Sequence, residues 1–238
     1  MTDDEFTTLE CSVNSMLPSD VKIWNLSIAP IPPSSSLVDR WHAIISSEKK
    51  LYSYYISTRK TLDPLQRYSR THVHRPVNIT KLKHILQHYK GTHDFRAFSG
   101  AIEANQRKKN KLSTNTTRTI YDIQFVEETL DNNEEETGLY RIDILLNGAL
   151  YKMIRNMIGT AIDLCLIHDE YYLNKNFKRP RITEELFLDL LHQRRMEECN
   201  SNDSTEKKIV VSTRDDNPCK PAPPEGLTLE WVFYDDDF

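Results

Sequence analysis

The stretch from Asn147 to Cys165 carries a strong helical pattern and constrains the fold more than any other part of the chain. Its apolar residues recur every three or four positions, so at about 100° per residue they fall on one side of a helix. The members of this stripe are Leu150, Met153, Ile154, Met157, Ile158, Ala161, Ile162 and Cys165. A stripe of this kind must be buried. We therefore predict an amphipathic helix over Asn147 to Cys165 that packs on a core.

One charged residue of this helix is not explained by its packing pattern. Arg155 lies beside the apolar stripe, on the same flank as Lys152 and Gly159. Because glycine has no side chain, another backbone or a substrate can approach closely at Gly159. Most charged residues are exposed, so this segment taken alone favours an ordinary solvent-facing role for Arg155.

The composition is that of an ordinary globular chain. Of the 238 residues, 38% are hydrophobic and 28% are charged. No run approaches about eighteen apolar residues, and the first residues, M-T-D-D-E-F, are acidic, so we predict neither a membrane span nor a secretory signal. We expect an intracellular protein with no membrane partner, in a compartment that the sequence does not specify. The cysteines form no Cys-x-x-Cys pair, which argues against a disulfide framework or a zinc site; they are Cys11, Cys165, Cys199 and Cys219.

Positive charge is concentrated between Arg40 and Arg118. This block contains 17 lysine and arginine residues against four acidic ones, although the net charge of the whole chain is −4. Six of the eight histidines lie in the block, together with several tyrosines and phenylalanines. Basic residues interleaved with aromatic ones are typical of a surface that binds a polyanion. The alternative is a solvated face whose charge is balanced by acidic neighbours in space.

The order of the predicted elements indicates the fold class. We expect strands at Trp41–Ser57, Thr119–Glu127, Leu139–Leu146 and Gly226–Tyr234, and, besides the central helix, helices at Thr80–Gly91 and Thr183–Arg194. Strands joined as hairpins and interrupted by helices predict an α+β fold, with an antiparallel sheet and helices packed on one of its faces.

Two histidines of the first predicted helix have a spacing that occurs in metal sites. His84 and His88 are four residues apart, so they lie one above the other on the helix. They are on the side opposite the apolar stripe and have lysines around them. We interpret both as solvated side chains and predict no metal site.

Four stretches carry motifs that occur together, in this order, in one family. The first is Trp41–Ile56, W-H-A-I-I-S-S-E-K-K-L-Y-S-Y-Y-I, which resembles F-H-A-R-F-S-A-x-x-R-x-Y-x-Y-x-I. The second is Gly91–Phe98, G-T-H-D-F-R-A-F, followed by Thr117–Ile120, T-R-T-I. The third is the central helix, similar to F-x-x-x-M-V-R-N-I-V-G-T, and the last is Glu225–Tyr234, similar to E-G-L-x-L-x-x-V-x-Y. Together they resemble the TruA type of tRNA pseudouridine synthase over most of the chain.

The resemblance implies a pseudouridine synthase fold and an isomerase activity. That fold has two α+β halves that share one antiparallel sheet, with an RNA-binding cleft between them. The implied reaction converts uridine to pseudouridine in the anticodon stem-loop region of tRNA, without a metal, organic or other small-molecule cofactor. Family members are commonly dimers, so the resemblance also implies a homodimer.

The resemblance assigns roles to two residues. Tyr52 corresponds to the active-site tyrosine, and Arg155 to the arginine that pairs with the catalytic aspartate. These roles agree with the chemistry, because a tyrosine ring can stack on a flipped uracil and a guanidinium can hold a carboxylate ionised and oriented. The expected RNA contacts are Lys49, Lys50, Arg59, Lys60, Arg67, Arg70, Arg96 and Arg118.

The chain departs from the family pattern in one important respect. The catalytic aspartate of the family belongs to an R-T-D motif that precedes the region matched here, and the nearest substitute, Thr213-Arg214-Asp215, stands in the wrong place in the order. In addition, Ile44 replaces the arginine of F-H-A-R. We therefore expect residues 1–57 to be the remnant of an N-terminal α+β half. Residues 58–238 are expected to form the C-terminal α+β domain, with a disordered loop near 196–224.

Three functions remain open at this stage. The first is a tRNA pseudouridine synthase whose present chain is inactive alone because the aspartate is missing. The second is a non-catalytic RNA-binding remnant of the same family. The third is a structural dimerisation module with no role on RNA, and the basic block between Arg40 and Arg118 counts against it.

Overall fold

The chain forms two compact units in the computed structural model. The smaller contains Met1–Ser47 and Tyr234–Phe238, and the larger contains Glu48–Phe233. Residues 48–57 belong to a strand of the larger unit. The structure describes residues 2–29, 41–100, 102, 115–128, 138–167, 182–192, 196–201, 204–209 and 212–234.

The smaller unit is built around α1 (Asp3–Met16). The helix begins with a capping box, in which Thr2 and Glu5 each satisfy a backbone amide of the other. No residue of α1 is buried. The side chain of Asn14 fixes the segment that follows, because it donates to the carbonyl of Ile23 at 2.7 Å and accepts from its amide at 2.8 Å.

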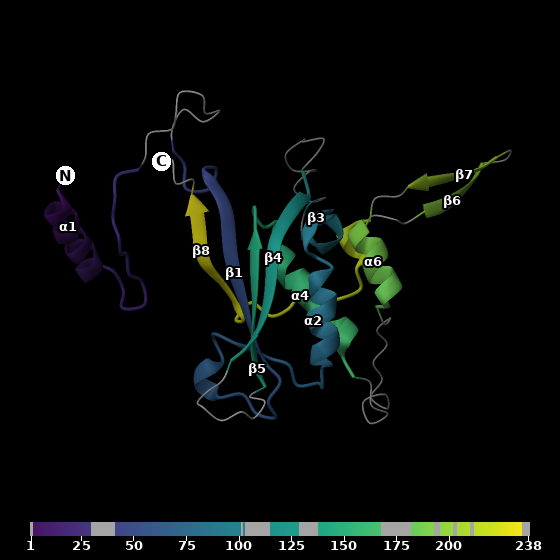
Figure 1. The fold of residues 1–238 in the computed structure, drawn as a ribbon, viewed down its shortest axis with the longest axis horizontal. Helices are drawn as coiled ribbons and strands as arrows, with labels where there is room; N and C mark the ends of the chain where they lie inside the picture. The colour runs from purple at the N-terminus through teal and green to yellow at the C-terminus, as the bar shows by residue number, and fades with distance from the viewer. Residues whose placement is uncertain are drawn as a thin grey trace. The chain divides into compact units, whose positions relative to one another are not determined.

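The larger unit contains a six-stranded sheet with helices beside it (Figure 1). The strands are β1 (Ser47–Ser57), β2 (Thr71–His72), β3 (Gly91–Asp94), β4 (Thr117–Glu127), β5 (Leu139–Leu146) and β8 (Leu227–Tyr234). The helices are α2 (Ile79–Gln87), α4 (Met153–Cys165) and α6 (Glu184–His192), with single 3-10 turns η1 (Pro64–Gln66), η2 (Arg96–Phe98) and η3 (Arg214–Asp216). A separate hairpin consists of β6 (Met196–Ser201) and β7 (Ser204–Ile209).

The strand order of the sheet is β2-β1-β5-β4-β3, and β8 pairs with β1. The pairs β1–β5, β5–β4 and β4–β3 are antiparallel, as the sequence predicted. The sheet is nevertheless mixed, because the short β2 lies parallel to the end of β1. The predicted α+β class is confirmed.

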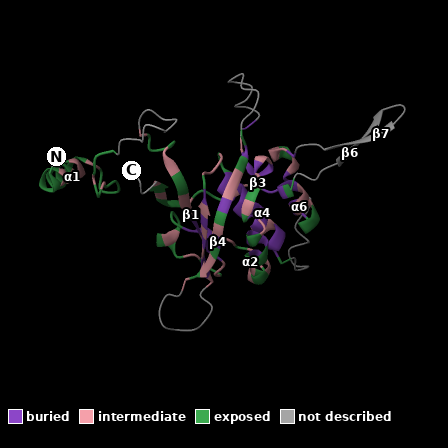
Figure 2. Ribbon diagram, turned by 45° about the horizontal axis from the view of Figure 1, so that its top comes forward, coloured by how far each residue is buried: buried purple, intermediate pink, exposed green. Residues whose placement is uncertain are grey.

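The core lies on one face of this sheet. Alternate residues of the central strands are fully buried there, among them Tyr54 and Ile56 of β1 and Ile142 and Ile144 of β5. They belong to one apolar cluster with residues of α2, α4 and α6, and Figure 2 shows buried residues gathered where the sheet meets these helices. On the opposite face, Ser53 donates to Asp143 across the β1–β5 pair at 2.6 Å.

The segment from 212 to 224 differs from its prediction as part of a disordered loop. Four of its residues are buried, namely Ser212, Asn217, Cys219 and Ala222. The Asn217 amide donates to the hydroxyl of Thr160 on α4 at 3.0 Å, and its side-chain oxygen accepts from the amide of Cys219 at 3.1 Å. This polar segment is therefore ordered by contacts with α4. No helix within the described ranges is both long and apolar enough to cross a membrane.

Candidate active site

The central helix begins later than the sequence predicted. Its first helical residue is Met153, not Asn147. Residues 147–152 instead form the turn from β5, because Gly148 has φ 148° and Lys152 has φ 60°, values that a right-handed helix does not contain. The side chain of Asn147 holds this turn by accepting from the amide of Thr119 at 3.0 Å. As a result, Arg155 lies in the first turn of α4.

Arg155 joins α4 to residues 220–223, which we call the covering segment. Its Nε donates to the carbonyl of Ala222 at 2.7 Å, and the amide of Ala222 donates back to the carbonyl of Arg155 at 2.7 Å. The Arg155 side chain is half-buried. Within the described residues, its two terminal nitrogens have neither a hydrogen-bond nor an ion-pair partner. One edge of the guanidinium is thus fixed while the other is open.

Gly159 permits the covering segment to approach the helix. A Cβ atom at this position would lie 2.1 Å from the carbonyl oxygen of Lys220 and 2.8 Å from the amide nitrogen of Ala222. Neither distance is possible between real atoms, so a residue with a side chain would displace the segment. The close approach predicted for Gly159 is confirmed, and the approaching group is backbone.

The other end of the covering segment is held by a residue that the sequence did not single out. The Tyr54 hydroxyl donates to the carbonyl of Pro223 at 2.7 Å and lies 2.7 Å from the hydroxyl of Thr71. Burial raises the pKa of Tyr54; the nearby Glu225 raises it further, while the Thr71 hydrogen bond and the charge of Arg155 lower it. Tyr54 therefore donates a hydrogen bond as a neutral phenol. Its place on the apolar face of a strand made it look like an ordinary core residue.

Gly226 lies where the chain passes close to the backbone of β1. A Cβ atom there would lie 2.6 Å from Oγ1 of Thr71 and 2.7 Å from the carbonyl oxygen of Tyr55. The carbonyl of Gly226 accepts from the amide of Tyr55 at 2.8 Å. The E-G-L motif thus requires glycine at this position, because any side chain would collide with Thr71 and with the backbone of β1.

Tyr52 lies two residues before Tyr54 and on the same face of β1. It is paired with Ile144 of β5 and is half-buried against the core. Burial raises its pKa, so its hydroxyl is protonated at neutral pH. Its hydroxyl has no hydrogen-bond partner within the described part of the chain. No hydrogen bond or cation–π contact joins Tyr52 to Arg155 among the described residues; Tyr54 is the residue of this strand whose pKa the charge of Arg155 affects.

The triplet Thr213-Arg214-Asp215 forms a structural turn. The amide and hydroxyl of Thr213 both donate to the carboxylate of Asp216, which caps η3. The guanidinium of Arg214 donates to the carbonyls of Asn217 and Cys219. Asp215 itself is exposed. The side chains of Thr213 and Arg214 therefore stabilise the fold of the 212–224 segment.

The residues expected to contact RNA fall into two groups at opposite ends of the sheet. Lys49 and Lys50 stand at the start of β1, where Lys50 pairs with Leu146, and Arg118 is close by because Leu146 also pairs with Ile120 of β4. Lys49 lies over the ring of Tyr121 at 5.5 Å, and burial lowers the pKa of the half-buried Arg118. Arg96 begins η2, and its Nε is buried without a partner among the described atoms.

The second group follows the end of β1. Arg59 and Lys60 lie in the turn after the strand, and Arg67 is exposed over the ring of Tyr68 at 4.2 Å. Arg70 does not fit its prediction as an RNA contact, because it is only 9% exposed. Its Nη1 donates to the carbonyls of Ile56 at 3.0 Å and Tyr140 at 3.2 Å, and its Nη2 donates to Glu128. Arg70 therefore ties the ends of β1 and β5 together.

A cavity of about 240 Å³ lies beside the covering segment. Gly159 and Asp163 of α4 line it together with His72, His74 and Arg75. The carboxylate of Asp163 is 3.7 Å from the Arg75 guanidinium. Because this carboxylate already has a cationic neighbour, it is a poor candidate for the partner of Arg155.

Comparison with known proteins identifies the class to which this chain belongs. A family model described as tRNA pseudouridine synthase matches residues 85–235. The chain is 30% identical to tRNA pseudouridine synthase A 1 of Protochlamydia amoebophila over 233 residues, which cover 98% of this chain and 70% of the relative. It is 32% identical to tRNA pseudouridine synthase A of a Thermoanaerobacter species over 226 residues, 95% of this chain and 70% of the relative. A Bacillus velezensis synthase A is 34% identical over 152 residues, covering 64% and 52% of the two chains.

These matches define the chain as a member of an RNA-modifying isomerase class. More specifically, the chain belongs to the tRNA pseudouridine synthase family. The resemblance derived from the four sequence motifs is confirmed.

Proposed function

We propose that this chain provides the arginine, the tyrosine and the RNA-binding surface of an enzyme that isomerises uridine to pseudouridine in tRNA. The observation that carries the proposal is the state of Arg155. Its Nε is fixed to Ala222, whereas its terminal nitrogens have no partner within the described residues. Such a guanidinium is oriented in advance for a bidentate bond to a carboxylate.

The proposed reaction breaks the bond between C1′ of the ribose and N1 of the uracil. The base turns, a new bond forms between C1′ and C5, C5 loses its proton and N1 gains one, so the product is an isomer of the substrate. A carboxylate must act at the sugar or the base, and the uridine must leave its stack to reach it. Arg155 holds that carboxylate ionised by charge and by two parallel hydrogen bonds.

Tyr52 is proposed to contact the flipped uracil. Its hydroxyl has no partner among the described residues, and its ring lies on the same face of β1 as Tyr54. A half-buried ring offers a stacking surface, and a phenol whose pKa is raised by burial can donate a hydrogen bond without losing its proton. The proposed role is therefore to hold the base while the glycosidic bond is remade.

The two basic groups are proposed to contact the tRNA backbone. They stand at opposite ends of β1, which has 11 residues, so at the usual rise per residue they are separated by about 35 Å. The anticodon stem-loop region is the proposed target. The proposed contacts are Lys49, Lys50, Arg96 and Arg118 at one end and Arg59, Lys60 and Arg67 at the other, and Arg70 is left out because it is buried.

The source of the catalytic carboxylate separates the proposal from its alternative. The 238 residues contain no R-T-D sequence. We propose that the aspartate is supplied by a segment outside this sequence, and that this chain alone is inactive. The same observation favours a second candidate, an RNA-binding member of the family that performs no catalysis. A homodimer also stays a prediction, which sedimentation equilibrium can test.

The decisive experiment combines binding and turnover. The chain is expected to bind an unmodified tRNA transcript without forming pseudouridine, which is detected chemically in the RNA. Joined to an N-terminal segment that carries R-T-D, it is expected to form pseudouridine. In that protein Arg155→Ala should remove most turnover and leave binding largely intact, whereas Lys83→Ala, an exposed cation on α2, should change neither. No turnover in the joined protein would favour the non-catalytic candidate, and equal loss of binding and turnover in Arg155→Ala would make Arg155 an RNA contact.

A further inference from the structure

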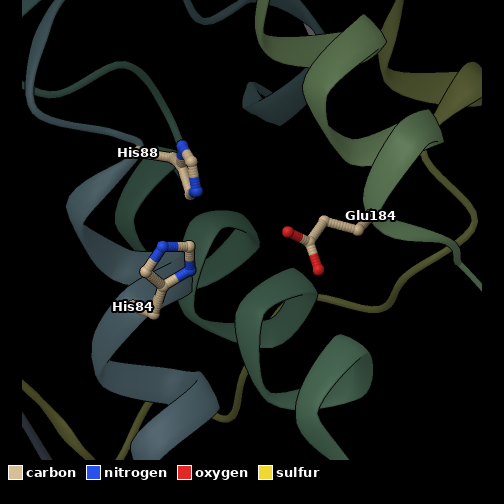
Figure 3. Close-up of side chains that lie close together, drawn as sticks. All are labelled: His84, His88 and Glu184. Atoms are coloured by element: carbon tan, nitrogen blue, oxygen red, sulfur yellow. The ribbon is translucent and has the colours of Figure 1, made fainter.

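A second cluster of chemically active side chains lies between two helices of the larger unit. His84 lies on α2, His88 is the C-cap residue of that helix, and Glu184 is the first residue of α6. Figure 3 shows the three side chains directed toward a common space between the helices. One ligand atom from each of the three lies within 4.8 Å of the others. The sequence showed only the histidine pair, because Glu184 is almost one hundred residues further along the chain.

His88 differs from an ordinary solvated histidine. It is half-buried, and its Nε2 is buried without a hydrogen-bond partner among the described residues. Buried polar atoms in folded proteins nearly always have a partner, so an orphan nitrogen calls for an explanation. The rings of His84 and His88 meet edge to face, with centroids 4.9 Å apart. Both rings can therefore be directed to one point.

The competing partner of Glu184 is weak. The Nζ of Lys81 lies 3.9 Å from its carboxylate, and both side chains are substantially exposed. Exposed pairs at this separation contribute little to stability. A divalent cation would carry twice the charge of the ammonium and would contact the carboxylate directly, so it would displace Lys81 from Glu184.

We propose that His84, His88 and Glu184 bind one zinc ion, with water in the fourth position. Two histidines and one glutamate are a ligand set that zinc accepts in tetrahedral sites. In such a site the ligand atoms are about 3.4 Å apart, and the exposed side chains of His84 and Glu184 can rotate to reach this spacing. The ion ties the start of α6 to α2. This site is separate from Arg155 and does not depend on the function proposed above.

The test is a zinc titration of the full chain after removal of metal by a chelator. Cys11 is exposed, and a thiolate is a zinc ligand that would confuse the titration, so every protein carries Cys11→Ser. Competition with a chromogenic chelator should give one equivalent of tightly bound zinc. His84→Ala and Glu184→Gln should each weaken binding at least tenfold. His74→Ala, which removes a histidine that contacts His72 elsewhere in the unit, should leave the affinity unchanged.

Two further measurements separate the proposed site from adventitious binding. Zinc should raise the thermal midpoint of the parent protein and not that of His84→Ala, because a ligand stabilises only the state that binds it. Lys81→Ala should bind zinc at least as tightly as the parent, since the competing charge is removed. The proposal is overturned if the parent binds no zinc at sub-millimolar concentrations, or if His84→Ala and Glu184→Gln bind as tightly as the parent. Both substitutions are at exposed positions, and circular dichroism verifies that the variants are folded.

Discussion

Gly159→Ala tests whether the covering segment is held against α4 as described. In an isolated helix this change stabilises, because alanine has a helix propensity about 1 kcal/mol better than that of glycine. In this protein the new Cβ would lie 2.1 Å from the carbonyl oxygen of Lys220. The segment must move away, and the two hydrogen bonds between Arg155 and Ala222, both 2.7 Å long, must lengthen or break.

The expected size of the effect follows from these contacts. Loss of two hydrogen bonds costs about 0.5–1.5 kcal/mol each. Forcing an extra methyl group into a packed site costs about 1–3 kcal/mol. After the propensity gain of about 1 kcal/mol is subtracted, the free energy of unfolding should fall by about 3 kcal/mol, within a range of about 1–5 kcal/mol. The sign is opposite to that expected from the helix alone.

Urea unfolding followed by circular dichroism measures this change. With a typical urea dependence of about 2 kcal/mol per molar, the midpoint should fall by about 1.5 M. Gly100→Ala is the matched control, because its new Cβ would meet only side chains, the exposed Tyr151 at 3.2 Å and Lys152 at 3.6 Å, and no backbone. That variant should differ little from the parent. A Gly159→Ala protein as stable as the parent, or more stable, would refute the described approach of the covering segment.

Three other predictions concern the interior of the larger unit. Arg70→Lys should lower the free energy of unfolding by about 2–4 kcal/mol, because one ammonium cannot replace the guanidinium that binds two carbonyls and Glu128. An unchanged midpoint of urea unfolding would show that these contacts are not made. Asn217→Ala should lower the free energy of unfolding by about 1–3 kcal/mol, because its side chain bonds to Thr160 on α4 and to the amide of Cys219; an unchanged thermal midpoint would contradict this role. Burial raises the pKa of the Cys165 and Cys219 thiols to about 12. Just above pH 9 these thiols therefore lose their protons only in the unfolded chain, so the free energy of unfolding should fall as the pH rises through that region. The Cys165→Ala, Cys219→Ala double variant should show a weaker fall in urea unfolding at alkaline pH, and an identical fall would contradict the assignment.

Elements whose pattern depends on one buried face were predictable from the sequence. The strand at Leu139–Leu146 is found with the predicted ends, since alternation with one buried side fixes both the extent and the register of a strand. The central helix was predicted with its apolar stripe, but its start was wrong. Leu150 fits the helical period, yet the backbone at Gly148 and Lys152 takes positive φ values that apolar periodicity cannot reveal.

Contacts between distant segments were not predictable in the same way. The 212–224 segment has a polar composition that is typical of disorder, and it is ordered because Asn217 finds partners on α4. The charge of Arg70 suggested a surface residue, but the carbonyls that bind it come from β1 and β5. Glu184 completes a cluster with His84 and His88 only because α6 lies beside α2. Each of these results depends on tertiary neighbours, which a single sequence does not show.

The fixed Nε of Arg155 explains why arginine, rather than another cation, suits this site. A guanidinium free to rotate would lose conformational entropy on pairing with a carboxylate, and its orientation would not be set. The bond from Nε to the Ala222 carbonyl fixes the plane of the group, so the direction of its terminal nitrogens is set before a carboxylate arrives. A lysine could not do the same, because its three donors share one nitrogen and cannot make two parallel bonds to a carboxylate in a plane that is set by a bond to Ala222. Gly159 admits the segment and the segment orients Arg155, so these two residues and Ala222 act as one structural unit. In a protein that carries the aspartate, Arg155→Lys should therefore lose nearly as much turnover as Arg155→Ala, and a lysine variant with turnover close to the parent would show that charge alone is sufficient.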